Sequence, residues 1–214
     1  MTRGTWFVAV ALIVAVFVGS ILVYGKLPER ILTHWNLRGE VDGFGSRAVG
    51  VLLLPIVLVG LVGLFAVLSW MSPTSFKMDG FRATYGAIVI ITLTLLSFIH
   101  VLALTATLGY RVDMTRFIVA AALFALGLMG NFLGKVRRNF FIGFRVPWTL
   151  ANERIWNETH RLAAWVMFGC GFLGSAVALA GHPLVGQGLI LPIVIVPILF
   201  SLYRYKQLEA RGEV

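Results

Sequence analysis

Six long runs without Asp, Glu, Lys or Arg dominate this sequence of 214 residues. They cover residues 5–24, 48–70, 84–110, 117–134, 162–181 and 184–203. A helical run of about 18 or more apolar residues is long enough to cross the ~30 Å hydrocarbon core of a bilayer. Hydrophobic residues make up 59% of the chain, which is more than the roughly one half that is usual for a soluble domain. The sequence therefore predicts an all-α, polytopic membrane protein with six transmembrane helices.

Lys and Arg are distributed unevenly between the segments that join these runs. If the N-terminus is cytoplasmic, twelve of the 18 basic residues fall in cytoplasmic segments and six in the segments on the other side. Basic segments close to span ends tend to stay in the cytoplasm, so we expect both termini there. This topology and attraction to anionic membrane lipids account for much of the net charge of +9. We therefore expect no direct binding of nucleic acid.

The six runs contain little chemistry that could drive catalysis or transport. None holds an Asp or Glu, whereas pumps and ion-coupled transporters commonly use intramembrane carboxylates. His100 is either a proton or ligand site, or a neutral imidazole that is hydrogen-bonded to a neighbouring helix. The single cysteine, Cys170, excludes an internal disulfide. We predict no catalytic residue and no cofactor, and keep a small-molecule or peptide exporter as an alternative function.

The segment 25–47, which we expect on the outside, is rich in polar and aromatic residues. Pro28 and Glu29 suit the first turn of a short helix, and residues 39–46 indicate a turn-rich return to the membrane. Three interpretations stay open: a contact surface for a peptide, a metal site, or a turn with Trp and His anchors at the headgroups. Because no fixed metal-ligand spacing is present, we expect no bound metal; a membrane metalloenzyme is the second alternative.

The segment 135–161, which we expect in the cytoplasm, is too polar to cross a bilayer. Thr149 is a suitable N-cap, so we expect residues 150–161 to form a short interfacial helix that leads into the fifth span. Basic residues before it would meet lipid headgroups, and aromatic residues would insert beneath them; these residues are Lys135, Arg137, Arg138, Phe140, Phe141 and Phe144. The segment is a membrane anchor, a docking platform for a cytoplasmic partner, or a site where His160 and Glu153 act catalytically.

Paired glycines predict close contact between helices. The pairs are Gly130 with Gly134, Gly60 with Gly63, and Gly171 with Gly174. A glycine lets the backbones of two membrane helices approach closely, because it has no side chain. We therefore expect all three pairs to lie at helix interfaces.

Two segments resemble signatures of the SdpI family of bacterial membrane proteins. "LPERILTHWNLRGEVDGFGSR" is similar to the DUF1648 segment of that family, and "GNFLGKVRRNFFIGFRVPWTLANERIWNETHR" is similar to its second signature. Leu32 and Gly134 replace prolines of the pattern and Val146 replaces a threonine, so loop rigidity is expected to differ. The resemblance implies three parts: a DUF1648-like segment at 1–70, a middle part at 71–116, and an SdpI-like segment at 117–214.

The resemblance also implies a function in the bacterial cytoplasmic membrane. Family members include the immunity protein of a sporulation-delay killing system, which protects its producer from a secreted peptide toxin and holds a cytoplasmic repressor, here expected to be of the ArsR type, at the membrane. The toxin would then contact Glu29, His34, Trp35, Asn36, Glu40 and Asp42. The repressor would dock on Asn139, Arg145, Pro147, Trp148, Asn152, Glu153, Trp156, His160 and Arg161. The sequence leaves open whether the protein forms a homo-oligomer.

Overall fold

The computed structural model describes residues 1–36, 39–72 and 78–213. Within these residues, six helical segments are long and apolar enough to cross a membrane. They are Arg3–Tyr24 (α1), Arg47–Met71 (α2), Arg82–Thr107 (α3), Met114–Leu133 (α4), Glu153–Leu179 (α6), and Pro183–Glu209, which comprises α7 (Pro183–Gly188) and α8 (Ile190–Glu209). The predicted six-span, helical membrane protein is therefore confirmed.

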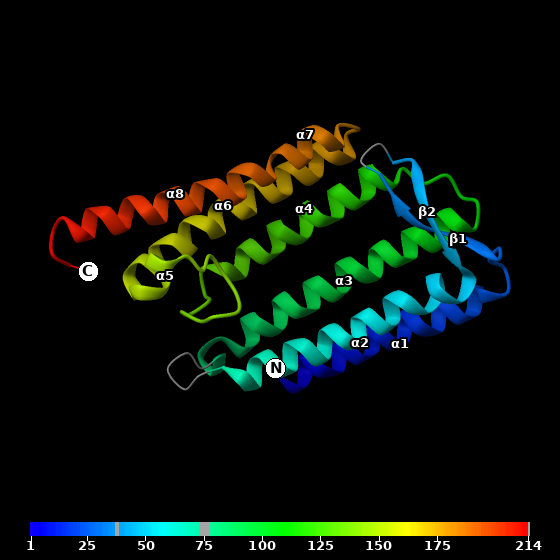
Figure 1. Ribbon diagram of the computed structural model, residues 1–214, viewed down its shortest axis with the longest axis horizontal. Coiled ribbons are helices and arrows are strands. Elements are labelled where there is room, and N and C mark those ends of the chain that lie inside the picture. Colours follow the sequence, from blue (N-terminus) through cyan, green and yellow to red (C-terminus); the bar gives the residue numbers. More distant parts are fainter. Residues whose placement is uncertain (37–38, 73–77, 214) are drawn as a thin grey trace.

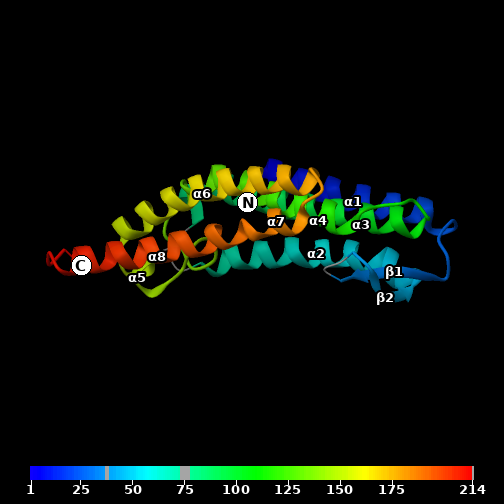
Figure 2. The same ribbon diagram turned by 90° about the horizontal axis from the view of Figure 1, so that it is seen from above.

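The helices lie side by side along the longest axis of a flattened bundle (Figures 1 and 2). Helices α1, α2 and α3 form one half, and α4, α6, α7 and α8 form the other. A β-hairpin covers one end, which we call the hairpin end. The opposite end holds the turn η2 (Met78–Phe81), the short helix α5 (Pro147–Ala151) and the end of α8. The two segments singled out in the sequence thus lie at opposite ends of the molecule.

The segment between α1 and α2 forms a two-stranded antiparallel sheet. Strand β1 (Arg30–Trp35) pairs with β2 (Val41–Ser46), and the register is irregular around His34. The expected short helix after Pro28 and the expected turn-rich return are therefore both wrong. The physical reason is that β1 gains cross-strand partners, which a helix of one or two turns on the membrane surface would lack.

Helices α4 and α6 pack with their backbones in contact. A Cβ atom added to Gly171 would lie 2.5 Å from the backbone nitrogen of Gly127, and one added to Gly130 would lie 2.8 Å from the backbone nitrogen of Phe168. The prediction for Gly130 and Gly171 is thus confirmed. The other four members of the predicted pairs are in less crowded positions. A Cβ at Gly174 would lie 3.0 Å from the carbonyl oxygen of Gly186, and one at Gly134 would make ordinary contacts with α6. A Cβ at Gly60 or Gly63 would meet no atom within 4 Å other than the adjacent helix backbone. For Gly60 and Gly63 the expectation is wrong within the described residues.

His100 lies in α3 and is buried against α1. Its Nε2 atom is 2.7 Å from Oγ of Ser20, whose hydroxyl is also 2.7 Å from the carbonyl oxygen of Val16. The structure therefore matches the second of the two interpretations, an imidazole that is hydrogen-bonded to a neighbouring helix. This bond ties the two helices together close to the hairpin end.

Candidate functional site

Two apolar residues attach the hairpin to the bundle. Leu27 and Ile31 are each 2% exposed and pack with Val51 of α2 and Leu104 of α3. Ile31 occupies the space above Gly50, where a Cβ atom would lie 1.4 Å from the end of the isoleucine side chain. The hairpin is consequently docked on α2 and α3 rather than suspended as a free loop.

Glycines in β2 make room for the side chains of β1. A Cβ at Gly43 would lie 2.6 Å from Cβ of His34, and one at Gly45 would lie 2.9 Å from the methyl group of Thr33. Side chains alternate along a strand, so the residues between and beside these glycines, Asp42 and Phe44, point to the exposed side. Strand β2 thus contains glycines at these two positions because side chains of β1 occupy the space beside them.

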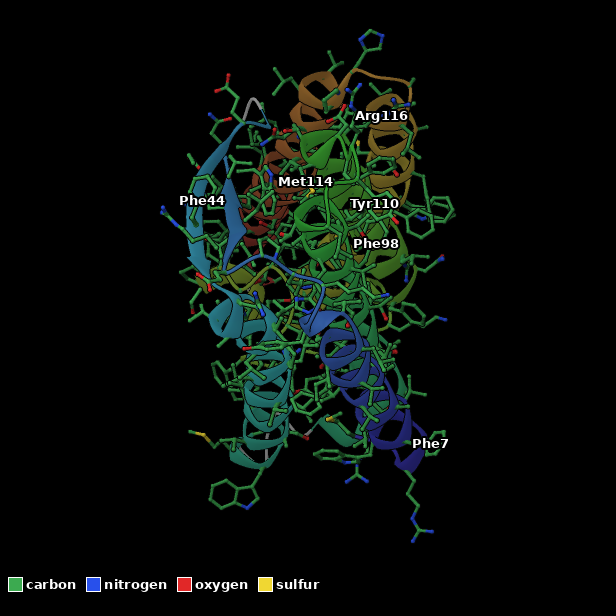
Figure 3. The ribbon with its side chains drawn as sticks, turned by 90° about the vertical axis from the view of Figure 1, so that its right-hand side faces the viewer. Phe7, Phe44, Phe98, Tyr110, Met114 and Arg116 are labelled. Atoms are coloured by element: carbon green, nitrogen blue, oxygen red, sulfur yellow. The ribbon has the colours of Figure 1, made fainter. Side chains whose placement is uncertain are left out.

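The exposed side of the hairpin presents an aromatic ring beside charged groups. His34 Nδ1 and Asp42 Oδ1 are 2.5 Å apart and both side chains are exposed. Phe44 is 56% exposed, and the guanidinium of Arg30 lies 5.4 Å from the centre of its ring. We call Arg30, His34, Asp42 and Phe44 the hairpin face; Figure 3 shows Phe44 at the edge of the molecule.

The six residues predicted to contact a toxin are divided between four environments. His34 and Asp42 pair on the hairpin face. Asn36 and Glu40 close the hairpin turn: Asn36 Nδ2 donates to Glu40 Oε2 at 2.8 Å, and the backbone N–H of Glu40 donates to Asn36 Oδ1 at 3.1 Å. Trp35 is half-buried opposite Val41. Glu29 is exposed, and its carbonyl oxygen accepts from the backbone N–H of Arg47.

The same arrangement bears on the metal interpretation. No group of three or more His, Cys, Asp and Glu side chains that could hold a metal ion occurs in residues 1–36, 39–72 and 78–213. His34 and Asp42 form a pair without a third ligand of this kind in those ranges. The described residues therefore provide no set of ligands that would support the metalloenzyme alternative.

At the opposite end, Asn139 organises the segment between α4 and α5. Its side chain is fully buried. Nδ2 donates to the carbonyl oxygens of Arg137 (2.8 Å) and Ile142 (3.0 Å), and Oδ1 accepts from the backbone N–H groups of Phe141 and Ile142, both at 2.7 Å. One amide thus satisfies four backbone groups, which explains why this irregular segment holds one shape.

His160 and Trp156 form a buried stack beneath that segment. Their ring centres are 3.9 Å apart, and the two side chains are 1% and 0% exposed. The backbone N–H of Phe144 donates to His160 Nε2 at 2.9 Å, so Nε2 carries no proton, and Nδ1 donates to the carbonyl oxygen of Trp156 at 2.8 Å. The indole Nε1 of Trp156 donates to the carbonyl oxygen of Val136 at 2.8 Å. A neutral imidazole therefore links α6 to the segment above it.

Gly143 fits this stack for two reasons that the sequence did not reveal. Its φ angle is +116°, a region that residues with a Cβ atom rarely adopt. A Cβ there would also lie 2.2 Å from His160 Nε2 and 3.2 Å from Cη2 of Trp156. The only available signal was a glycine in a segment rich in aromatic residues, which does not identify the side chains that it contacts.

The short helix before the fifth span differs from the predicted one. A helix does precede the span, but it is α5, and residues 153–161 are the first turns of α6 itself. Asn152, rather than Thr149, caps α6 by accepting from the backbone N–H groups of Arg154 and Ile155. Thr149 is buried within α5, where its hydroxyl accepts from the Val146 N–H and lies 2.7 Å from the carbonyl oxygen of Phe144. The prediction failed because a competing cap lies three residues later.

Side chains from α8 hold α5 and α6 in place. Trp148 Nε1 donates to the buried hydroxyl of Ser201 at 2.7 Å. Glu158 of α6 accepts from the guanidinium of Arg204 at 2.5 and 2.8 Å. Arg138 adds a further brace, because its Nη1 donates to the carbonyl oxygens of Leu150 and Ala151 at the end of α5. Apart from Trp148, these residues were not among the predicted site residues.

The residues predicted for partner docking differ in their exposure. Asn139, Trp156 and His160 are buried and hold the segment together, and Trp148 and Asn152 are half-buried. The exposed members are Arg145, Pro147, Glu153 and Arg161; Nη1 of Arg145 also donates to the carbonyl oxygen of Phe140. A partner at this end would meet the exposed group, while the buried group fixes the surface that it meets.

The predicted insertion of aromatic residues into lipid is only partly compatible with this arrangement. Phe141 and Phe144 are partly buried and pack against the core of the bundle, which makes the expectation wrong for them. Phe140 is 42% exposed. Hydrogen bonds from their backbones to Asn139 and His160 turn the two inward residues toward the core.

Comparison with known proteins gives three matches. Residues 135–203 match the SdpI/YfhL protein family, and residues 11–59 match a domain of unknown function, DUF1648. The chain is also 26% identical over 205 residues to the immunity protein SdpI of Bacillus subtilis (strain 168), which covers 94% of this chain and 96% of the relative. No solved structure matches the chain. The segment matched by the SdpI/YfhL family contains the Asn139 to His160 region, and the segment matched by DUF1648 contains the hairpin.

Proposed function

From the matches of residues 135–203 to the SdpI/YfhL family and of residues 11–59 to DUF1648, and the similarity of the chain to the immunity protein SdpI, we propose that this chain is an immunity protein of the SdpI type. It binds a secreted peptide toxin on its hairpin and holds a cytoplasmic repressor at the opposite end. It is a multi-pass membrane protein of bacteria with six spans. The observation that carries the proposal is the placement of two separate built surfaces at the two ends of one bundle (Figure 1). The proposal adopts the orientation expected from the distribution of Lys and Arg.

The hairpin face has the chemistry to hold a membrane-active peptide. An exposed aromatic ring offers apolar area, and rings of this kind dominate the binding energy of many contact surfaces. The neighbouring Asp42 carboxylate and Arg30 guanidinium offer charges of both signs beside Phe44. Since Ile31 fixes the hairpin on α2 and α3, the face is presented in one geometry, which lowers the entropy cost of binding.

The surface at the opposite end is rigid and polar. The buried Asn139 and His160 contacts fix the segment, and Glu153 and Arg161 are exposed on the first turns of α6. Such a surface suits reversible docking of a soluble protein, because interfaces of this type carry polar rims on a fixed scaffold. An ArsR-type repressor is the partner that the family resemblance implies.

Growth of a sensitive bacterium tests the toxin part of the proposal. The host expresses this protein and is exposed to a dilution series of the sporulation-delay toxin. His34→Ala combined with Phe44→Ala should abolish protection while the protein still reaches the membrane. Phe7→Ala is the matched control, because it removes a ring that is 76% exposed on α1 and far from the hairpin (Figure 3). It should protect as well as the unaltered protein.

The second surface is tested with the same cells and a fluorescent repressor. Glu153→Ala combined with Arg161→Ala should leave protection intact but prevent the toxin-dependent movement of the repressor to the membrane. Unchanged protection by the hairpin variant would contradict toxin binding at that face. Loss of protection by the second variant at normal abundance would show that the two ends do not act separately.

A further inference from the structure

A long apolar groove lies between α3, α4 and the end of α6. Its volume is about 420 Å³, within the range of roughly 300–1,000 Å³ that is usual for small-molecule sites. Ala120, Ala121 and Ala125 of α4 form part of its lining, and Phe98, Phe117 and Phe124 line it with larger rings. The groove exists because the three alanines of α4 are too small to fill the space between the phenylalanine rings.

The groove extends along the helix axes through half of the spanning region. On α4 its lining runs from Phe117 to Leu128, which corresponds to about 16 Å at 1.5 Å per residue. Phe117 lies in the first turn of α4 and Leu179 is the last residue of α6, so the groove starts at the hairpin end. The hydrocarbon core is ~30 Å thick, so the length of the groove is about half of that thickness.

The dimensions favour a thin apolar chain over a peptide helix. A helix with side chains is about 10 Å across and rises 5.4 Å per turn, so that each turn occupies roughly 400 Å³. Three turns of helix, the length of the groove, would need roughly 1,200 Å³, which is more space than the groove offers. An alkyl chain is unbranched and narrow, and can follow the full length of the groove.

A basic side chain stands at the end of the groove where a headgroup would lie. Arg116 directly precedes Phe117, and its Nη2 donates to the carbonyl oxygen of Leu179. Its Nε is buried and has no hydrogen-bond partner among the described residues. Figure 3 shows Arg116, Tyr110 and Phe98 on the side of the molecule away from Phe44. Guanidinium groups match the geometry of phosphate oxygens.

We propose that this groove holds one acyl chain of an anionic phospholipid, whose phosphate is bound by Arg116. The lipid comes from the leaflet at the hairpin end and fills the space between the two halves of the bundle, on α3 and α4. This inference does not depend on the proposed immunity function, because it rests on the groove, its length and the charge at its end.

Native mass spectrometry of the purified protein with added phosphatidylglycerol tests the proposal. The unaltered protein should retain one phospholipid. Ala121→Phe should lose it, because the ring fills the groove, and Arg116→Gln should reduce retention several-fold and remove the preference for phosphatidylglycerol over phosphatidylcholine. Val59→Phe, at a position of α2 that is 56% exposed and outside the groove, is the matched control and should retain the lipid.

Three results would overturn the proposal. One is the absence of a retained lipid in the unaltered protein. Another is equal retention by Arg116→Gln and the unaltered protein, a comparison that stays informative even if Ala121→Phe does not fold. The third is unchanged lipid retention by Ala121→Phe, which would place the bound lipid outside the groove.

Discussion

Buried polar side chains decide the shape of the segment between α4 and α6. Asn139 satisfies four backbone groups, and the neutral His160 bridges Phe144 and Trp156. A buried polar group left without its partner costs about 1–3 kcal/mol, so each of these residues stabilises the segment by keeping its neighbours paired. They contribute to a docking surface indirectly, because they fix the positions of the exposed residues around them.

Gly143→Ala should lower the stability of the protein. The left-handed backbone alone costs a residue with a Cβ atom about 1–2 kcal/mol, and the new methyl group would also displace His160. We expect a clear decrease in the midpoint of thermal unfolding in detergent. Gly169→Ala is the control, since a Cβ at Gly169 of α6 would meet no atom within 4 Å other than the adjacent helix backbone and alanine there favours a helix. Equal midpoints for the two variants would contradict the role given to Gly143.

Individual residues of the candidate sites were predictable only where their chemistry is visible in the sequence. Glu153 and Arg161 were expected at the surface and are exposed. His160 was predicted as a docking residue together with them, yet it is buried against Trp156, because its tertiary contact with Phe144 is not visible in the local sequence. Phe44 was not singled out, since an exposed ring between two glycines has no periodic signal of its own.

The hairpin shows what local patterns miss at the level of an element. Strand β2 has glycines at the two positions where side chains of β1 come closest. Its sequence therefore lacks the alternation of apolar and polar residues that identifies a half-buried strand. The spans were predictable because length and apolarity are conditions that each span must meet alone. The hairpin depends on its partner strand and on Gly50 of α2, neither of which a local pattern contains.

Ile31→Ala should release the hairpin from the bundle. The side chain is 2% exposed, and removing a buried isoleucine of this kind costs about 2–5 kcal/mol. We expect faster cleavage by trypsin at Arg30 and Arg47 in the purified protein, with the helices remaining intact. Thr33→Ala changes an exposed residue of the same strand and serves as the control; cleavage at the same rate in both variants would contradict the anchoring role of Ile31.

For the whole molecule, orientation is the property that the sequence predicts and the fold alone does not reveal. The helices place the hairpin and the Asn139 to His160 region at opposite ends, and the distribution of Lys and Arg predicts which end is outside. In a protein with Cys170→Ala, a cysteine at Thr33 should react with an impermeant thiol reagent in intact cells, and one at Asn157 only after lysis. The reverse pattern would exchange the two sides.

The binding of toxin at the hairpin is tested most directly by photo-crosslinking in intact cells. A photoreactive phenylalanine analogue replaces Phe44 of the hairpin face or Phe140 at the opposite end, which are 56% and 42% exposed. The cells are then treated with the sporulation-delay toxin and irradiated. Position 44 should give a covalent adduct with the toxin and position 140 should give none. An adduct at position 140 alone, or none at position 44 in a protein that still protects the cell, would contradict toxin binding by the hairpin.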